Sequence, residues 1–348
     1  MVGKSEIPDA VLAEYGLESA QISAFGNGLI NQTHLVLVQA DQQERFVLQR
    51  VNPIFPPEVN RDIDLVTRCL ARKGLPTPSI VPTRQGALWV ELDQDVWRLL
   101  TYVEGVSHDA LNGAKQAGEA GALLARFHRT VADIDHGFAN LRLGIHDTAK
   151  HLRFLEETLT KKTDHPQHQA IAKLGREILD VAGSLQTLPP LPDRVVHGDP
   201  KINNIIFELG TDNALCLIDL DTIARMPLPL EFGDAFRSWC NGSGEDGRKG
   251  EFSADLFAPA VEGYASEARG WVTAQEWSAI VPATEIILIE LASRFCADAL
   301  NENYFAWDPD KFASRSEHNA VRAAGQLAVA RSLASQRKEL ENIVEQFA

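Results

Sequence analysis

The hydrophobic pattern of this chain changes near Gly105, and the change limits its possible folds more than any other feature. Before Gly105, short apolar or β-branched runs alternate with polar turns, as in residues 33–39 and 45–51, which is typical of consecutive antiparallel strands. After Gly105, apolar residues recur at helical spacing in segments at 114–131, 147–161, 166–186, 252–268, 274–305 and 318–345. We therefore predict two parts, a β-rich one of residues 1–104 and a mainly helical one of residues 105–348.

The β-rich part is expected to contain five strands and one helix. Strand-like runs lie at 20–26, 33–39, 45–51, 87–92 and 96–103. One helix is predicted over residues 57–73, because prolines stand at its start, apolar residues follow at helical spacing, and Gly74 ends it. The total of 348 residues agrees with two folded units of ordinary size.

The charge balance excludes some classes of partner. The chain has 33 Lys and Arg against 48 Asp and Glu, which gives a formal net charge of −15. Nucleic-acid binding normally requires a basic face, so we expect no nucleic-acid partner. A small anionic ligand remains possible because it needs only a local cluster of donors.

The chain shows no sign of export or of a membrane span. Its first residues lack a basic segment followed by an apolar one, and no stretch reaches the ~18 apolar residues that a span requires. The four cysteines are scattered, without a C-x-x-C pair. A cytoplasmic protein with reduced thiols is therefore expected, while the sequence gives no indication of the oligomeric state.

The strongest chemical signal is the segment His197–Asn204, HGDPKINN, which interrupts the helical part between two β-like runs. It places Asp199 and Asn204 five residues apart on one loop, with Lys201 between them, and Asp219 follows fifteen residues after Asn204. Phosphoryl transfer needs a carboxylate to orient the attacking hydroxyl and oxygen ligands to hold Mg²⁺. The pattern therefore favours phosphoryl transfer, with Lys201 able to reach the transferred group. The alternative is a capped turn followed by an unrelated acidic strand end.

HGDPKINN together with LIDLD resembles the aminoglycoside phosphotransferase and choline kinase-like superfamily of small-molecule kinases. The segments GNGLINQTHLV, FVLQRVNPIFPPEVN, ALWVELDQDVWRLLTYVEG and SEHNAVR are, in this order, similar to the bacterial N-acetylhexosamine 1-kinases. The resemblance extends from about residue 20 to about residue 330. It implies an α+β, protein-kinase-like bilobal fold, with a five-stranded antiparallel β N-terminal lobe carrying one helix and a mainly helical C-terminal lobe. It also implies ATP and Mg²⁺ as cofactors.

The resemblance implies roles for the acidic residues of the motif. Asp199 becomes the catalytic base, and Asn204 and Asp219 become the Mg²⁺ ligands. Asp221, two residues beyond Asp219, is a weaker candidate for a second metal or for the substrate. Asp234 matches an acid that supports the catalytic loop.

The nucleotide is expected between the two lobes. The glycine-rich loop Gly26–Asn31, with Gly26, Gly28 and Asn31, lies where the family covers the phosphates, and glycines allow close backbone approach. A simple hairpin turn is the alternative for this loop. The hinge is expected at Thr101, Tyr102 and Val103, whose backbone would contact the adenine edge, unless the segment is an ordinary strand end.

One position departs from the broad kinase pattern. The strand position that usually holds a phosphate-pairing Lys or Arg is Gln49, and Arg50 should point to the opposite face of a regular strand. The hexosamine kinases tolerate Gln there, so the resemblance does not imply an inactive protein. The cationic group is left unassigned, with Asp64 as a candidate partner on the following helix.

The resemblance indicates only a few residues of the acceptor site. The resemblance implies that Arg294 contacts a sugar and that Asp147 lies on the substrate side, although Asp147 could equally be the N-cap of the next helix. Two family sugar contacts are replaced, by Leu29 and Ser238. We predict ATP- and Mg²⁺-dependent phosphorylation of a small-molecule hydroxyl, with the anomeric hydroxyl of an N-acetylhexosamine favoured. Another sugar, homoserine, choline or an aminoglycoside remains open, as does a non-catalytic nucleotide-binding regulator.

Overall fold

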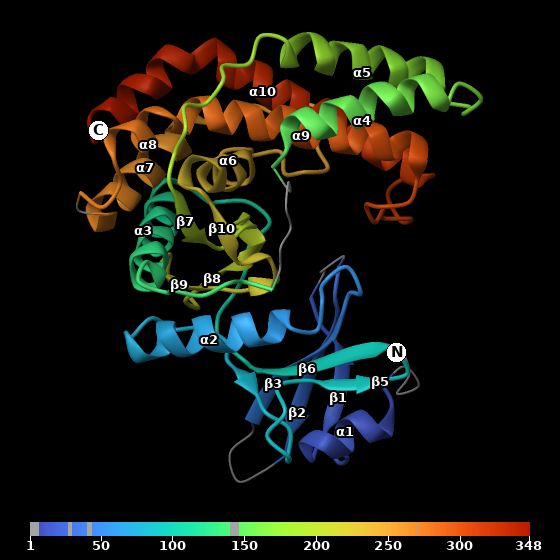
Figure 1. Ribbon diagram of the computed structural model, residues 1–348, viewed down its shortest axis with the longest axis vertical. Helices are drawn as coiled ribbons and strands as arrows, with labels where there is room; N and C mark the ends of the chain where they lie inside the picture. The colour runs from blue at the N-terminus through green and yellow to red at the C-terminus, as the bar shows by residue number, and fades with distance from the viewer. Residues whose placement is uncertain (1–6, 27–29, 40–43, 140–145, 269) are drawn as a thin grey trace.

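The computed structural model describes residues 7–26, 30–39, 44–139, 146–268 and 270–348. Figure 1 shows a small part built on a sheet below a larger part built from helices, with helix α2 lying between them. The same order was expected from the change of periodicity near Gly105.

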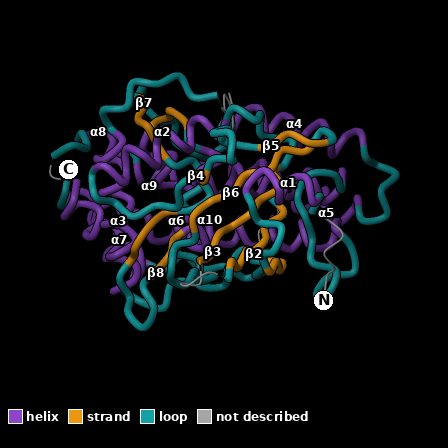
Figure 2. Tube along the Cα trace, turned by 90° about the horizontal axis from the view of Figure 1, so that it is seen from below, coloured by secondary structure: helices purple, strands orange, loops and turns teal. Residues whose placement is uncertain are grey.

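The N-terminal part is an antiparallel sheet with the order β1-β2-β3-β6-β4 and with β5 paired to β6. Figure 2 shows its strands crossing the face seen from below. Helix α2 and the strands predicted around it are confirmed, and the structure adds helix α1 and the two-residue strand β4. The elements are α1 (Asp9–Tyr15), β1 (Gln21–Ala24), β2 (Gln32–Val38), β3 (Glu44–Val51), α2 (Val59–Arg72), β4 (Ile80–Val81), β5 (Val90–Leu92) and β6 (Asp95–Thr101).

The two faces of this sheet belong to different hydrophobic clusters. Alternate residues such as Val36 and Leu48 form one cluster with α1. The buried stripe of α2, which includes Ile63 and Val66, joins the cluster of the helical part instead. Side chains on one face of a strand recur every second residue, and those on one face of a helix every third or fourth, which explains this division.

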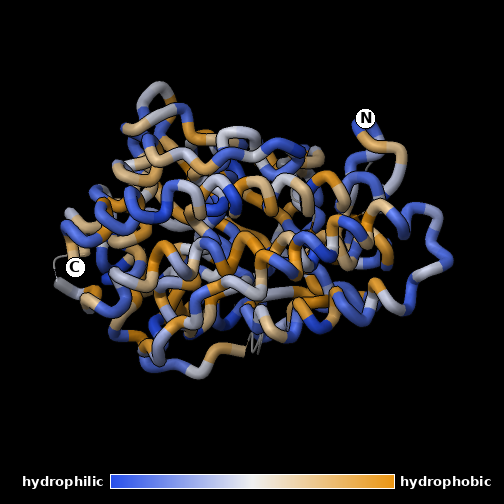
Figure 3. Tube along the Cα trace, turned by 90° about the horizontal axis from the view of Figure 1, so that it is seen from above, coloured by the Kyte–Doolittle hydropathy of each residue, from blue (hydrophilic) through white to orange (hydrophobic). Residues whose placement is uncertain are grey.

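The C-terminal part is helical around α9. This helix is apolar on nearly all sides, as expected for a helix covered by neighbours, and it packs against α4, α5, α6 and α10. Figure 3 shows hydrophobic stretches frequent in the middle of the molecule. The helices are α3 (Ala114–Val131), α4 (Thr148–Lys161), α5 (His168–Ala182), α6 (Leu228–Trp239), α7 (Ala254–Ala268), α8 (Ala274–Ser278), α9 (Ile280–Asn301) and α10 (Arg315–Glu345).

Two short strand pairs lie within the helical part, where the sequence predicted an extended region. β7 (Asp193–Val196) pairs with β10 (Ala224–Pro227), and β8 (Ile205–Phe207) pairs with β9 (Ala214–Leu217). The 3₁₀ turns η1 (Ile202–Asn204) and η2 (Leu220–Thr222) connect them. The polar motif therefore emerges from β7, and the second acidic segment follows β9.

Within the described part of the chain, no helix combines the length and apolar character needed to cross a membrane. The four cysteines are buried and none of them is in a disulfide.

Candidate active site

The loop that follows β7 is held by a buried carboxylate on α6. Glu231 accepts hydrogen bonds from the backbone N–H of His197 and from that of Gly198, each at 2.9 Å. Burial alone would raise the pKa of Glu231, but its hydrogen bond with His128 and the backbone N–H of Gly198 lower it. The carboxylate is therefore charged and fixes the start of the loop that follows β7.

Gly198 is required by the close approach of this loop to η2. Its φ is 85°, and a Cβ atom there would lie 2.2 Å from the carbonyl oxygen of Thr222. The Thr222 hydroxyl in turn donates a 3.0 Å hydrogen bond to the carbonyl oxygen of His197. A side chain at position 198 would push these two segments apart.

His197 joins the same two segments through its ring. Its Nδ1 accepts from the backbone N–H of Asp199 at 3.3 Å, and its Nε2 donates to the carbonyl oxygen of Ile218 at 2.9 Å. Burial lowers the pKa of His197, which agrees with a neutral ring donating through Nε2 only. Asp199 and Asp219 are thereby held in fixed relation.

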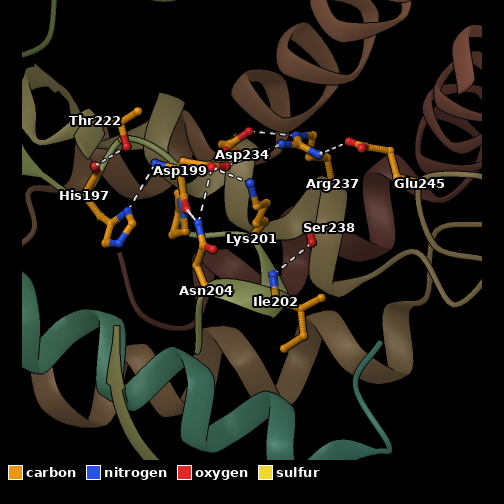
Figure 4. A network of polar contacts seen from close by, with 12 residues as sticks. His197, Asp199, Lys201, Ile202, Asn204, Thr222, Asp234, Arg237, Ser238 and Glu245 are labelled. Carbon is orange, nitrogen blue, oxygen red and sulfur yellow. Dashed lines mark hydrogen bonds and ion pairs between the residues drawn. The ribbon is translucent and has the colours of Figure 1, made fainter. Parts of the chain in front are cut away.

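Asp199 lies at the centre of the polar network in Figure 4. Lys201 Nζ donates to Asp199 Oδ2 at 2.7 Å, and Asn204 Nδ2 donates to the Asp199 carbonyl at 2.8 Å and to Oδ2 at 3.3 Å. Arg237 Nη2 lies 4.0 Å from Asp199 Oδ1 and also pairs with Asp234 at 2.7 Å. Burial alone would raise the pKa of Asp199, but the charges of Lys201 and Arg237 lower it. The carboxylate is therefore ionised at neutral pH.

Asp219 follows β9 in a left-handed conformation, with φ of 64°. Burial and the neighbouring charge of Asp221 raise its pKa to about 7. Asp199 adds to this effect, while Lys201 and Arg98 oppose it. The motif thus brings three carboxylates close together, with Asp221 buried and Asp199 and Asp219 partly exposed.

This donor set fits a divalent cation. Asn204 uses its amide nitrogen on Asp199, which leaves its oxygen as the possible metal ligand, and Asp219 supplies a carboxylate whose charge is not fully offset. No group of three or more His, Cys, Asp or Glu side chains suited to a metal was found among the described residues. Two protein ligands are nevertheless enough for Mg²⁺, which commonly takes its remaining ligands from phosphate and water.

The N-terminal part contributes residues to the same cluster. Asn31 Nδ2 donates to Asp221 Oδ2 at 2.6 Å. Gln49 Oε1 accepts from Arg98 Nε at 2.8 Å and from Nη2 at 2.7 Å, and Arg98 pairs with Asp221. Arg50, next to Gln49, bonds to Asp95 instead, as its strand position predicts.

The glycine-rich loop is only partly described. Gly26 follows β1 with φ of 74°, whereas Gly28 and Leu29 lie outside the described residues. At the hinge, Thr101 N donates to the Ser79 carbonyl at 2.9 Å and Tyr102 N to the Arg45 carbonyl at 3.4 Å. Val103 continues this segment towards α3.

The hinge side chains meet the first loop. The ring of Tyr102 lies 5.9 Å from that of Phe25, centroid to centroid, and the Arg45 guanidinium lies 4.7 Å from the Tyr102 ring. The segment predicted as the hinge and the residue that precedes the glycine-rich loop are therefore neighbours.

The predicted acceptor residues have other partners. Asp147 Oδ1 accepts from Lys150 N at 2.9 Å and caps α4, which is the alternative left open by the sequence. Arg294 on α9 lies over the rings of Tyr304 and Phe305, at 5.8 Å and 5.5 Å from the ring centroids. Their contacts therefore do not join them to the Asp199 network, and their substrate roles stay predictions. Asp64 pairs with Arg68 on its own helix.

Several residues of the site were not predicted. Ser238 Oγ accepts from Ile202 N at 3.0 Å, and Trp239 Nε1 donates to the Pro200 carbonyl at 2.8 Å, so α6 supports the catalytic loop along its length. Glu231 and Arg98 were also missed. Each of these two residues is a charged residue inside an otherwise apolar run of the sequence. Charged residues are rarely buried unless they are paired, so this pattern could have indicated a buried ion pair.

Comparison with known proteins agrees with this geometry. Residues 21–269, well over half of the chain, match the APH family model, described as the phosphotransferase enzyme family. Among solved structures, an aminoglycoside phosphotransferase from Alicyclobacillus acidocaldarius subsp. acidocaldarius DSM 446 is similar, with 17% identity and a TM-score of 0.62 over 98% of each chain.

Two further structures cover most of the chain. A microcompartment-associated aminopropanol kinase has 17% identity and a TM-score of 0.62, over 94% of this chain and 97% of that one. An amicoumacin kinase in complex with AMP-PNP, Ca²⁺ and Ami has 13% identity and a TM-score of 0.59, over 96% and 92%. At these identities the structures show a shared fold, and they confirm the predicted α+β, kinase-like architecture.

Proposed function

Because the chain belongs to the phosphotransferase enzyme family, and so is a small-molecule kinase, we propose that it transfers the γ-phosphoryl group of ATP to a hydroxyl of its substrate, with Mg²⁺ as the metal. The favoured acceptor is the anomeric hydroxyl of an N-acetylhexosamine or a related sugar. That choice rests on the segments quoted from the sequence and on Arg294.

One observation carries the proposal. The carboxylate of Asp199 is ionised, partly exposed, and fixed by Lys201 and Asn204 in one loop. A carboxylate held in this way can accept a hydrogen bond from the incoming hydroxyl and direct its oxygen at phosphorus. Asp199 acts mainly by orientation, since the transition state for phosphoryl transfer is loose and needs little prior deprotonation.

The remaining residues supply charge and position. Asn204 and Asp219 would hold Mg²⁺, which would offset the negative charge of the nucleotide phosphates. Lys201 Nζ lies 2.7 Å from Asp199 Oδ2. Its positive charge would also offset the negative charge of the transferred group when a phosphate is bound nearby. Glu231 and His197 are fully buried and keep the loop in place.

An amino alcohol is the second candidate acceptor. The net charge of −15 favours a cationic substrate over an anionic one. A similar structure is described as an aminopropanol kinase, and choline, homoserine and aminoglycosides are amino-bearing hydroxyl compounds of the same kind. The choice between sugar and amino alcohol is made by the substrate panel below.

The first test is ADP release over a panel of N-acetylhexosamines, other sugars and amino alcohols. We expect turnover with one class and its loss by roughly 100-fold or more in Asp199→Ala, since general acid–base groups typically contribute that much. The exposed Asp164→Ala serves as the control and should behave as the wild type.

The product decides the hydroxyl. ³¹P and ¹H NMR should show phosphate on the anomeric oxygen if a sugar is the acceptor, and phosphate elsewhere would refute the 1-kinase assignment. Tight ATP binding without turnover of any hydroxyl compound would instead support a nucleotide-binding regulator.

A further inference from the structure

The guanidinium of Arg98 is the meeting point of four elements. It comes from β6, bonds to Gln49 of β3, lies 3.4 Å from Asn60 Oδ1 of α2, and pairs with Asp221 of η2. Both Arg98 and Asp221 are 1% exposed. A buried arginine requires a partner for its charge. The carboxylate that pairs with Arg98, that of Asp221, belongs to the other part of the molecule.

The register of the sheet explains why Arg98 reaches this place. Gln49 and Arg98 lie directly opposite each other on β3 and β6, and directly opposed residues share one face of a sheet. Gln49 occupies the position where kinases commonly carry a cation. In this chain the cation therefore reaches the same face from the neighbouring strand, and Gln49 orients it through two hydrogen bonds.

Asp221 connects Arg98 to the proposed metal ligand. It lies two residues after Asp219, in the 3₁₀ turn that Asp219 begins, and η2 packs against α2. Arg98 contacts both of its carboxylate oxygens, and Asn31 donates to Oδ2 as well. Asn31 is the last residue of the glycine-rich loop, so one carboxylate fixes both the metal-binding turn and the end of the phosphate-binding loop.

We propose that Arg98 is a positioning residue for the metal–nucleotide complex. It holds Asp221, and through Asp221 it keeps Asp219 and the Asn31 end of the glycine-rich loop in place across the two parts of the molecule. This inference rests on the proposed function, and it changes the expected role of Asp221 from a second-metal or substrate contact to a structural link. Arg98 itself need not touch substrate or nucleotide.

The test compares Arg98→Met, Arg98→Lys and the double variant Arg98→Met/Asp221→Asn with Arg50→Met. Arg50 is the matched control, since it also joins β3 to β6 through a 2.6 Å ion pair with Asp95, but that pair is 40% and 30% exposed. Two quantities are measured on the full chain. These are the dissociation constant of ADP by calorimetry, in excess Mg²⁺ and in EDTA, and the melting temperature.

Arg98→Met should weaken the Mg²⁺-dependent part of ADP binding by about 10- to 100-fold, the usual effect of removing a residue that orients a metal ligand. Arg98→Lys should recover part of this loss. Arg50→Met should stay within about twofold of the wild type, because exposed ion pairs contribute little.

The double variant separates positioning from stability. It leaves no unpaired buried charge, and Asn at position 221 still offers Asn31 an acceptor, so its melting temperature should exceed that of Arg98→Met. Its Mg²⁺-dependent ADP binding should remain weak. Recovery of both quantities in the double variant, or wild-type Mg²⁺ dependence in a folded Arg98→Met, would overturn the inference. Should Arg98→Met fail to fold, the double variant and Arg98→Lys decide alone.

Failure of the proposed function would look different. A wild-type protein whose ADP binding gains nothing from Mg²⁺ contradicts metal-dependent phosphoryl transfer itself. A wild-type protein that shows the gain, with variants that keep it, contradicts only the role of Arg98.

Discussion

A single buried ring, His197, links the catalytic loop to the segment before Asp219. Its neutral form is set by its surroundings, because burial disfavours the imidazolium more strongly than the nearby carboxylates of Glu231 and Asp199 favour it, and Lys201 also opposes a positive charge. The ring therefore works as a fixed donor and acceptor and takes no part in proton transfer. Protonation would abolish the acceptor at Nδ1 that receives the Asp199 N–H.

The lowered pKa of His197 predicts that the free energy of unfolding depends on pH. An unfolded histidine has a pKa of about 6.5, and the folded value is lower, so below about pH 6.5 the unfolded chain binds more protons. The free energy of unfolding should therefore fall as the pH falls through this range, by up to about 1.4 kcal/mol per pH unit from this residue.

His197→Gln isolates the contribution of the ring. Glutamine can still donate to the Ile218 carbonyl but does not titrate, so its unfolding free energy should depend less on pH between about 5 and 6.5. Urea unfolding at several pH values measures the difference between the two proteins. Equal slopes for both would show that His197 carries no linked proton.

At the scale of elements, the turn after β7 depends on glycine for two separate reasons. Gly198 combines a positive φ with a contact that a Cβ would make at 2.2 Å. Gly210, between β8 and β9, has a similar φ of 75°, but a Cβ there would meet nothing within 4 Å. The pair separates backbone strain from steric contact.

Gly210→Ala should lower the free energy of unfolding by about 1–2 kcal/mol, the strain of a left-handed non-glycine residue. Gly198→Ala should lower it further, by about 1–3 kcal/mol more, because the added methyl group overpacks the contact with Thr222, and it should also reduce kcat because the turn must move. Denaturant unfolding and steady-state kinetics measure the two effects. A Gly198→Ala protein as active as Gly210→Ala would show that the loop tolerates the shift.

The sequence predicted those elements whose signals are local. The strands around 33–51, the helix after Pro57 and the grouping of Asp199, Asn204 and Asp219 follow from patterns within a few tens of residues. Arg98 and Asp221 stand 123 residues apart, and only the register of β3 with β6 and the docking of η2 bring them together. Glu231 was missed for the same reason, since its backbone partners lie 34 and 33 residues earlier in the chain.

At the scale of the whole molecule, the boundary expected after residue 104 does not divide the hydrophobic core. Helix α2 precedes that boundary, yet Ile63 and Val66 pack in the cluster of the helical part. The Arg98–Asp221 ion pair and the hydrogen bond from Asn31 to Asp221 also cross it. The two parts should therefore stabilise each other and unfold together.

Two valines test this coupling, because both are fully buried and each belongs to a different cluster. Val36 lies in the cluster of the sheet and α1, and Val66 of α2 lies in the cluster of the helical part. Changing either to Ala removes two methyl groups and should lower the free energy of unfolding by roughly 2 kcal/mol. If the molecule unfolds as one unit, each change should shift a single calorimetric transition as a whole. A second transition that moves with Val36→Ala and ignores Val66→Ala would instead show that the sheet melts by itself, and the link through α2 and Arg98 would then be too weak to join the two parts.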